Sequence, residues 1–422
     1  MPYGVPFGQL VERKRCEAGL TPERLALKAL GSVSQVDVVR NLEAGRIRAP
    51  KQPIVAALSA ALSISQREIS ACRSAAEAAR GLGGPPRLME VIAQTFDSAR
   101  PSASQIERHG LLASKAKEYR AIRGSLIKMS LEGDRRRLLA NTVRSHLDSG
   151  DLTAAETFLE RAERLRQNES FRASVVRLRA AIALLACRPD RAAIMFEEAA
   201  ARVEQYSHEN ATELRYGAGR SLYQHALDFG SGRDLPAAFF RQVLEFWTRG
   251  EDAEKWAKAN NNLAMAVHGH ATRATRQAAA ALLPEAIDRY RDALTVFKKN
   301  YKPLRWASTL CNLAEALGDQ AHLVPPKDAA KLLEEAAERL RTALTVRMRG
   351  AQPMEFVTTQ HDLACILERH AKLYGADGAD LLAEAAEANR EALTVLSMEK
   401  TPHHWAAVQN HYANMLRSES LI

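Results

Sequence analysis

The sequence predicts an all-α protein in which a small domain of short helices precedes a solenoid of stacked helix hairpins. Residues 7–72 divide into short helical stretches punctuated by glycine and proline. From about residue 105 onward the chain reads as amphipathic helix, with an internal repeat of about 50 residues in its last part. The expected domains are residues 1–80, a linker with a short helix at 81–104, and a solenoid at 105–422 that is regular from about residue 250.

The composition is typical of a globular protein that is long enough to bury several cores. The 422 residues are 46% hydrophobic and 26% charged. No stretch approaches about 18 consecutive apolar residues, and the first residues lack the apolar run of a secretion signal. We therefore expect a cytoplasmic protein with no membrane partner. The five cysteines are scattered and form no Cys-x-x-Cys pair, which favours neither a disulfide framework nor a zinc cage.

The net charge of +9 is concentrated in the first third of the chain. Residues 1–80 and residues 81–150 each carry 12 basic and 7 acidic side chains, whereas residues 151–422 carry 35 basic and 36 acidic ones. Such asymmetry is expected when one end of a protein meets a polyanion and the remainder does not. The two parts of the chain therefore have different expected partners.

The first domain is expected to contain five helices. Thr21 can cap a helix whose first turn holds Pro22, and Gly31 can end it. Ser34 and Asp37 have the spacing of a capping box, which predicts the start of the third helix at Ser34. A short turn with glycine between the second and third helices gives a helix-turn-helix arrangement. The five expected helices cover residues 7–17, 21–30, 34–44, 53–62 and 65–73.

Three segments carry a resemblance to a known family. Gly19-Leu20-Thr21, the run from Asn41 to Arg46, and the run from Ala57 to Ser65 resemble the lambda-repressor/Cro-like, or XRE-type, helix-turn-helix domains over about 65 residues. The resemblance implies binding of double-stranded DNA by the third helix, with Val39 and Leu42 in the core. Asp37 also fits a helix cap. The residues that the resemblance places toward the bases are Gln35, Val36, Asp37, Arg40 and Asn41.

Phosphate contacts are expected from the loop that follows the third helix. Pro22 stands where this family often has a glutamine that touches a phosphate, and the stretch before the third helix is longer than the family pattern. Contacts to the DNA backbone fix register without base geometry, so flexible basic side chains suit them. The expected phosphate-binding residues are Arg46, Arg48 and Lys51.

The repeat is visible as short motifs that recur in register. Ala-Leu-Thr-Val occurs at 293–296, 343–346 and 392–395, and the helix that follows each linker begins with an aromatic residue. The units resemble tetratricopeptide repeats, although they exceed the usual period of about 34 residues by roughly 15. We expect the added length in the first helix of each unit or in its loop, for example at 270–283. The recurring aromatic residues, which we expect to serve packing, are Trp256, Trp306, Phe356 and Trp405.

The resemblance to tetratricopeptide repeats also predicts a binding groove. In that family the residue before the Leu-Ala pair of the first helix faces the concave surface. Side-chain amides there can pair with the donors and acceptors of a peptide backbone. The alternative is that these amides bridge adjacent helices. The predicted groove residues are Asn262, Asn312, Asp362 and His411.

No enzymatic motif is found, and we expect no catalytic residue, cofactor or metal site. His268 and His270 would point to different faces of a helix, and His403 and His404 precede a tryptophan. The last repeat helix, at 405–417, has no second helix after it, which favours either a terminal cap or packing against a second subunit.

The sequence thus favours a DNA-binding transcription regulator. The expected partners are operator DNA, a second copy of the chain, and a peptide or protein effector bound by the solenoid. The alternative is a protein-interaction scaffold or antitoxin-like adaptor whose basic head has no regulatory role.

Overall fold

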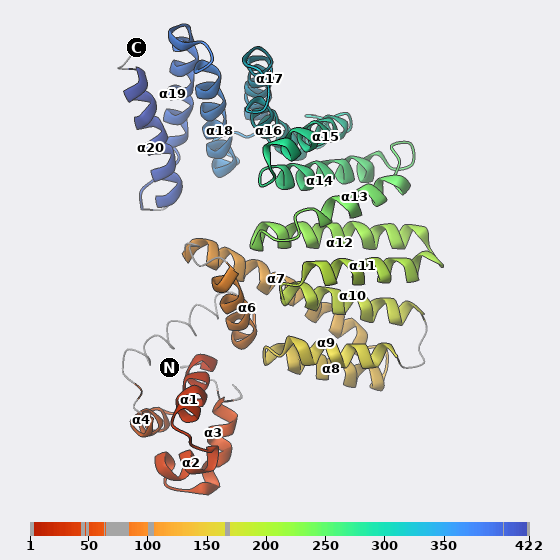
Figure 1. Cartoon of the computed structure of the whole chain (residues 1–422), viewed down its shortest axis with the longest axis vertical. Helices are drawn as coiled ribbons and strands as arrows, with labels where there is room; N and C mark the ends of the chain where they lie inside the picture. The colour runs from red at the N-terminus through yellow and green to blue at the C-terminus, as the bar shows by residue number, and fades with distance from the viewer. Residues whose placement is uncertain are drawn as a thin grey trace. The chain divides into compact units, whose positions relative to one another are not determined.

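The computed structural model describes residues 4–43, 47, 50–62, 64, 84–99, 105–164, 169–399 and 401–419. These residues form helices joined by short turns, and no strand occurs among them, which confirms the all-α fold for this part of the chain. The chain divides into two compact units (Figure 1). Unit 1 comprises Met1–Ala211 and Gln224–Gly232, and unit 2 comprises Thr212–Tyr223 and Arg233–Ile422. Helix α12 (His208–Phe229) contributes to both units.

Unit 1 begins with a small cluster of short helices. Thr21 accepts a hydrogen bond from the backbone N–H of Arg24 at the start of the second helix, and Gly31 ends that helix at a φ of 76°. Both termini agree with the sequence prediction. The buried core includes Phe7, Leu25 and Leu58. The elements are α1 (Gly4–Glu17), α2 (Pro22–Leu30), η1 (Val33–Gln35), α3 (Val36–Glu43) and α4 (Gln52–Ala61).

The capping-box spacing predicted that the third helix starts at Ser34. The structure shows a different start. The hydroxyl of Ser32 accepts the backbone N–H of Ser34 at 3.2 Å, and residues Val33–Gln35 form a 3-10 turn. Ser32 thus caps the 3-10 turn η1, which leads directly into α3 at Val36. The expected fifth helix, at 65–73, lies outside the described residues.

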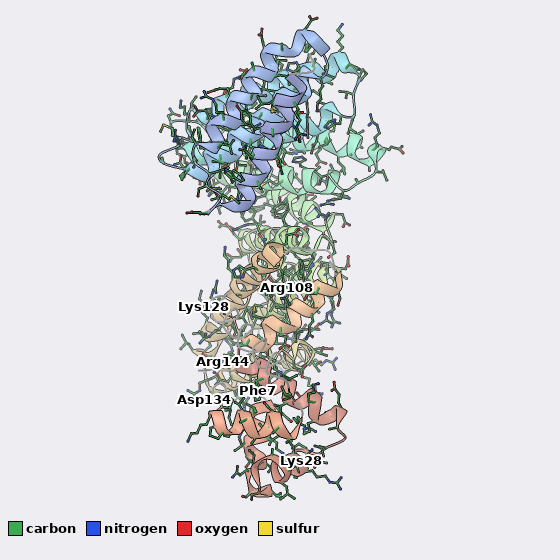
Figure 2. The ribbon with its side chains drawn as sticks, turned by 90° about the vertical axis from the view of Figure 1, so that its left-hand side faces the viewer. Phe7, Lys28, Arg108, Lys128, Asp134 and Arg144 are labelled. Carbon is green, nitrogen blue, oxygen red and sulfur yellow. The ribbon has the colours of Figure 1, made fainter. Side chains whose placement is uncertain are left out.

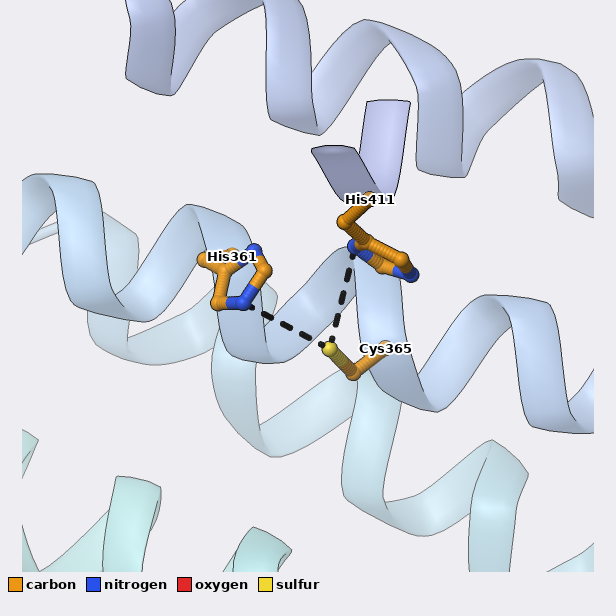
Figure 3. A group of neighbouring side chains, drawn as sticks. All are labelled: His361, Cys365 and His411. Atoms are coloured by element: carbon orange, nitrogen blue, oxygen red, sulfur yellow. Dashed lines mark hydrogen bonds between the residues drawn. The ribbon is translucent and has the colours of Figure 1, made fainter. Parts of the chain in front are cut away.

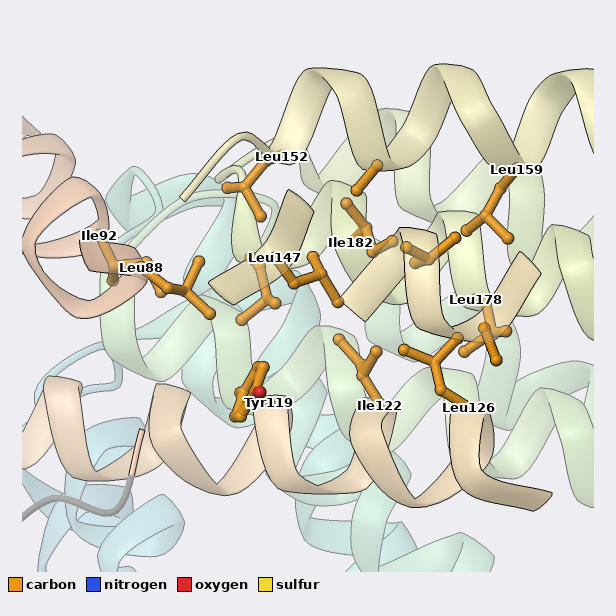
Figure 4. Packing of buried hydrophobic residues seen from close by; sticks show 14 of the residues in the cluster. Leu88, Ile92, Tyr119, Ile122, Leu126, Leu147, Leu152, Leu159, Leu178 and Ile182 are labelled. Atoms are coloured by element: carbon orange, nitrogen blue, oxygen red, sulfur yellow. The ribbon is translucent and has the colours of Figure 1, made fainter. Parts of the chain in front are cut away.

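The larger part of unit 1 is a stack of longer helices around one apolar core. Leu88 of α6, Ile122 of α7, Leu147 of α8, Leu159 of α9 and Ile182 of α10 meet in this core (Figure 4). Helix α6 is the short helix that the sequence predicted between the modules. The helices are α6 (Pro86–Ala99), α7 (Gln105–Ser130), α8 (Asp134–Asp148), α9 (Leu152–Glu163), α10 (Glu169–Leu185) and α11 (Pro189–Glu204).

Unit 2 contains the regular repeat. Its first helices begin at residues 253, 303, 353 and 402, which is the predicted period, and consecutive helices pack as hairpins (Figure 1). This part is an α-solenoid of tetratricopeptide-like hairpins. Its elements are α13 (Leu235–Phe246), α14 (Ala253–Ala271), α15 (Arg276–Leu294), α16 (Pro303–Ala321), α17 (Pro326–Leu344), α18 (Pro353–Ala371), η2 (Gly375–Gly378), α19 (Ala379–Leu393) and α20 (Pro402–Glu419).

In the first two units the added length lengthens both helices, not only the first helix or its loop, whereas in the third unit the second helix α19 has 15 residues and follows the turn η2. Helices α14 and α15 each have 19 residues, as do α16 and α17. Most of the segment 270–283 belongs to α15, which Thr275 caps by accepting the N–H of Ala278. Ala279 and Leu283 of this added stretch are buried, and their burial stabilises the longer second helix.

The second helices of successive units are linked by a repeated ion pair. The guanidinium of Arg291 on α15 reaches both carboxylate oxygens of Glu335 on α17, at 3.0 and 3.3 Å. Arg241 with Glu285 and Arg341 with Glu384 repeat this arrangement. The recurrence of one contact at equivalent places shows that the hairpins stack in a constant register.

Candidate functional site

The four predicted groove residues lie at equivalent places of successive first helices in unit 2. Each is the tenth residue of its helix, on α14, α16, α18 and α20 respectively. All four side chains are half-buried. The structure therefore gives the row a common position, but the four residues differ in what they contact. The row consists of Asn262, Asn312, Asp362 and His411.

Asn262 bridges two helices. Its Nδ2 donates a hydrogen bond to the hydroxyl of Tyr216 on α12, at 2.9 Å. The Tyr216 ring in turn packs against Trp247, with ring centroids 4.9 Å apart. At this position the side-chain amide therefore bridges two helices, which is the alternative to a groove contact. Its Nδ2 already has a hydrogen-bond partner within the chain.

Asn312 and Asp362 are different, because their polar groups are not used by the described part of the chain. Neither side chain forms a hydrogen bond or an ion pair with another described residue. Burial and the nearby Glu315 carboxylate raise the pKa of Asp362 to about 7, while Arg347 partly opposes this shift. Half-buried polar groups of this kind are available to a ligand that supplies matching donors and acceptors.

The polar side chains around Asn312 and Asp362 are held in place by contacts between repeats. Arg347 donates to the hydroxyls of Thr359 and Ser308, both at 3.0 Å. Thr309 donates to Oδ1 of Asn261 at 3.1 Å. These fixed neighbours give the two unused groups a rigid setting, which lowers the entropic cost of binding.

His411, the fourth member of the row, lies in a cluster that no sequence motif predicted. Its Nδ1 is 3.9 Å from Sγ of Cys365, and Cys365 Sγ is 3.9 Å from Nε2 of His361 (Figure 3). His361 and Cys365 are four residues apart on α18, a spacing that places both on one helix face. That spacing was the available sequence signal. The contribution of His411, from a different helix, was not deducible without the fold.

The predicted DNA-reading helix α3 has one buried and one exposed face. Val39 and Leu42 are fully buried, as expected. Gln35, in η1 just before α3, is exposed, and so are Asp37 and Arg40. The remaining two residues, Val36 and Asn41, are half-buried.

One charged group on the exposed face of α3 has a partner within the chain. Arg40 forms an ion pair with Glu23 of α2. Lys51, at the start of α4, is exposed. The other two expected phosphate-binding residues, Arg46 and Arg48, lie outside the described residues.

Further basic side chains of unit 1 lie on α7 and α8. Arg108, Lys128 and Arg144 mark these helices in Figure 2. In the basic run 135–137, Arg136 pairs with Glu132 and lies over the ring of Phe171, at 4.4 Å from its centroid. The run is thus partly neutralised by contacts within the protein.

No family model matches the chain, and no curated protein matches it. Among solved structures, the chain is similar to a signal-transduction ATPase with numerous domains, a STAND protein with a tetratricopeptide repeat sensor, from Pyrococcus horikoshii. The identity is 14%, the TM-score is 0.34, and the match covers 79% of this chain. The chain spans 54% of the length of that protein.

The fold itself defines the class of protein: an α-helical repeat protein with tetratricopeptide-like hairpins in unit 2. Among the described residues, no helix has both the length and the apolar character needed to cross a bilayer.

Proposed function

We propose that the chain is a protein-interaction repeat protein, and that unit 2 binds an extended peptide segment of a partner across α16 and α18. The observation that carries this proposal is the pair Asn312 and Asp362, which present unused hydrogen-bonding groups at equivalent places of two successive first helices. An extended peptide exposes backbone donors and acceptors on both sides, and an amide with a carboxyl group can pair with them.

The same pair suggests the chemistry of the partner. Asp362 and Glu315 are close enough for the charge of one to disfavour the charge of the other. A cationic side chain placed beside them would relieve this repulsion and favour the ionised form of Asp362. We therefore expect the bound segment to carry a lysine or arginine at that point.

A random peptide library displayed on phage tests the proposal. The full chain is immobilised, binders are selected, and the affinities of the selected peptides are measured in solution. We expect basic peptides whose affinity falls at least about tenfold with Asn312→Ala or Asp362→Asn, since each substitution removes at least one half-buried polar contact. The matched control is Asp288→Asn, an exposed carboxylate on the second helix α15. Peptides that bind all three variants equally well would overturn the proposal.

A second function, binding of double-stranded DNA by the head, is favoured by the exposed face of α3. With Val39 and Leu42 buried, the exposed side chains of Gln35, Asp37 and Arg40 lie outside the core, as in a helix that enters a major groove. In this proposal Arg40 leaves its ion pair with Glu23 and donates hydrogen bonds to a guanine. A homodimer places two of these N-terminal domains on paired half-sites. A partner bound by unit 2 would then act as the effector.

Selection of bound genomic fragments tests the DNA-binding proposal. The Arg40→Ala, Asn41→Ala double variant should lose sequence preference, because Arg and Asn read guanine and adenine edges. Lys117→Ala on α7 removes one exposed positive charge elsewhere in unit 1 and serves as the control. Equal enrichment of all fragments by the wild-type chain would rule out sequence-specific reading.

A further inference from the structure

The cluster at the end of the repeat array combines one thiol with two imidazoles. Sγ of Cys365 and the facing nitrogens of His361 and His411 all lie within 4.8 Å of one another. All three side chains are half-buried, so the cluster is shielded but not sealed. Two helices supply the groups: α18 gives His361 and Cys365, and α20 gives His411 (Figure 3).

Each histidine is oriented by an acceptor at its other ring nitrogen. His361 Nδ1 lies 3.1 Å from Oδ1 of Asn389, and His411 Nε2 lies 3.1 Å from Oε2 of Glu368. When these nitrogens donate, the nitrogens that face Cys365 keep their lone pairs. Metal-bound histidines commonly donate their other N–H to a carbonyl or carboxylate oxygen in this way.

We propose that His361 Nε2, Cys365 Sγ and His411 Nδ1 bind a divalent metal ion of the Zn²⁺ type. One thiolate and two imidazoles suit a borderline-soft ion and not Mg²⁺ or Ca²⁺, which prefer oxygen ligands. Around a tetrahedral zinc ion, sulfur and nitrogen ligands lie about 3.5 Å apart. The two S···N distances are 3.9 Å, so each would shorten only slightly when a zinc ion binds. The fourth position is open to water or to a side chain of a partner.

The neighbouring repeats show that packing does not demand these residue types. The places equivalent to His361 and Cys365 hold Asn261 and Met265 on α14, and Cys311 and Glu315 on α16. The fold therefore accepts apolar, amide, thiol or acidic side chains there. The combination of two imidazoles with a thiol occurs where α18 meets α20.

The hydrogen bonds within the cluster leave room for metal binding. Nδ2 of Asn389 donates both to His411 Nδ1 and to Sδ of Met415, each at 3.1 Å. When His411 Nδ1 binds the metal, this amide keeps the sulfur contact. Cys365 binds as the thiolate, so metal uptake releases one proton. The bound ion would join α20 to α18 and fix the last helix of the array.

Titration of the reduced, chelator-treated full chain with Co²⁺ tests the site. We expect one Co²⁺ per chain, with the intense visible bands of a tetrahedral ion and a thiolate-to-cobalt charge-transfer band, both removed by added Zn²⁺. Cys365→Ser should abolish the charge-transfer band, and His411→Gln should weaken binding. Cys16→Ser, which removes an exposed thiol far along the chain, should leave the spectrum unchanged. Circular dichroism confirms that each variant is folded.

Glu368→Gln tests the orienting contact. Loss of such a partner typically lowers metal affinity about 10- to 100-fold while the spectrum keeps its form. Two results would overturn the proposal: an octahedral Co²⁺ spectrum without a sulfur band, or an unchanged spectrum in folded Cys365→Ser. If Cys16→Ser also abolishes the spectrum, the Co²⁺ ion is bound by adventitious thiols and not by the proposed site.

Discussion

Asn262 on α14 donates its amide hydrogen to the hydroxyl of Tyr216 on α12, at 2.9 Å, and so links two helices of unit 2. The groove pattern of the sequence places Asn262 and Asn312 in one class, but this contact separates them. Asn262 has a structural partner, whereas the amide of Asn312 has none among the described residues.

Asn262→Ala should therefore lower the free energy of unfolding of unit 2 by about 1 kcal/mol, because the variant removes one partly buried hydrogen bond. Asn312→Ala should change it by less than about 0.5 kcal/mol. Urea unfolding of both variants, with Tyr216→Phe added to complete a double-mutant cycle, measures the coupling. A coupling energy of zero between positions 216 and 262 would contradict this interpretation.

Lys115 is the most deeply buried cation in the described part of unit 1. Its side chain is 0% exposed, and its Nζ lies 2.7 Å from Glu118 and 3.8 Å from Asp228. Lys115→Met should destabilise unit 1 by about 3–5 kcal/mol, because two partly buried carboxylates lose their cation. Lys117→Met, on the exposed side of α7, is the control and should cost less than about 0.5 kcal/mol. Thermal unfolding of the two variants compares them directly, and equal midpoints would refute the structural role of Lys115.

His225 should make the stability of unit 1 depend on pH. The ring is fully buried and stacks on Phe229, and burial, followed by the charge of Lys115, lowers the pKa of His225 from 6.5 to about 3. The unfolded chain therefore binds a proton below about pH 6.5 that the folded chain does not bind. The contribution of His225 to the free energy of unfolding is fully present above pH 6.5. As the pH falls from 6.5 toward 3, this contribution decreases by about 1.4 kcal/mol per pH unit.

His225→Phe isolates this effect, since phenylalanine keeps the stacking but does not titrate. The difference in unfolding free energy between the wild type and this variant should shift in favour of the variant as the pH falls from 6.5 to 4. Measuring the difference removes the contributions of Asp228 and Glu118, whose pKa values are raised by burial. A difference that stays constant with pH would show that His225 is not held neutral.

The repeated ion pairs between second helices should contribute little at high salt. Arg291 and Glu335 are 49% and 25% exposed, so solvent screens their attraction. Glu335→Gln should lower the unfolding free energy by about 0.2–1 kcal/mol at low ionic strength and by less in 1 M salt. Glu334→Gln, at an exposed neighbour that forms no ion pair with another described residue, is the control. A loss above about 2 kcal/mol that salt does not reduce would assign the pair a buried, structural role.

Much of the fold follows from the sequence because its signals are local. The recurring Ala-Leu-Thr-Val motif and the leading aromatic residues fix the register of α14 to α20, and Trp256, Trp306 and Trp405 pack against the core as predicted. Thr21 and Gly31 mark the ends of α2 for the same reason, since caps act within a few residues.

The errors occurred where two local signals compete or where distant residues meet. Ser32 and Ser34 both precede α3 and could each cap a helix. Only the structure shows that the Ser32 hydroxyl accepts the backbone N–H of Ser34. The lengthening of α15 depends on burial of Ala279 and Leu283, and the helix continues through Pro284, which in the sequence reads as a helix breaker. The cluster of His361, Cys365 and His411 requires two helices to meet, which no single-sequence spacing records.

The central claim is that a partner segment lies across α16 and α18. Photo-cross-linking tests it most directly: a peptide selected on the full chain carries one photoreactive residue beside its basic side chain, and mass spectrometry maps the attachment. We expect cross-links on α16 and α18 close to Asn312 and Asp362, and their loss in Asp362→Asn. Cross-links confined to α15, α17 or unit 1, unchanged in that variant, would contradict it.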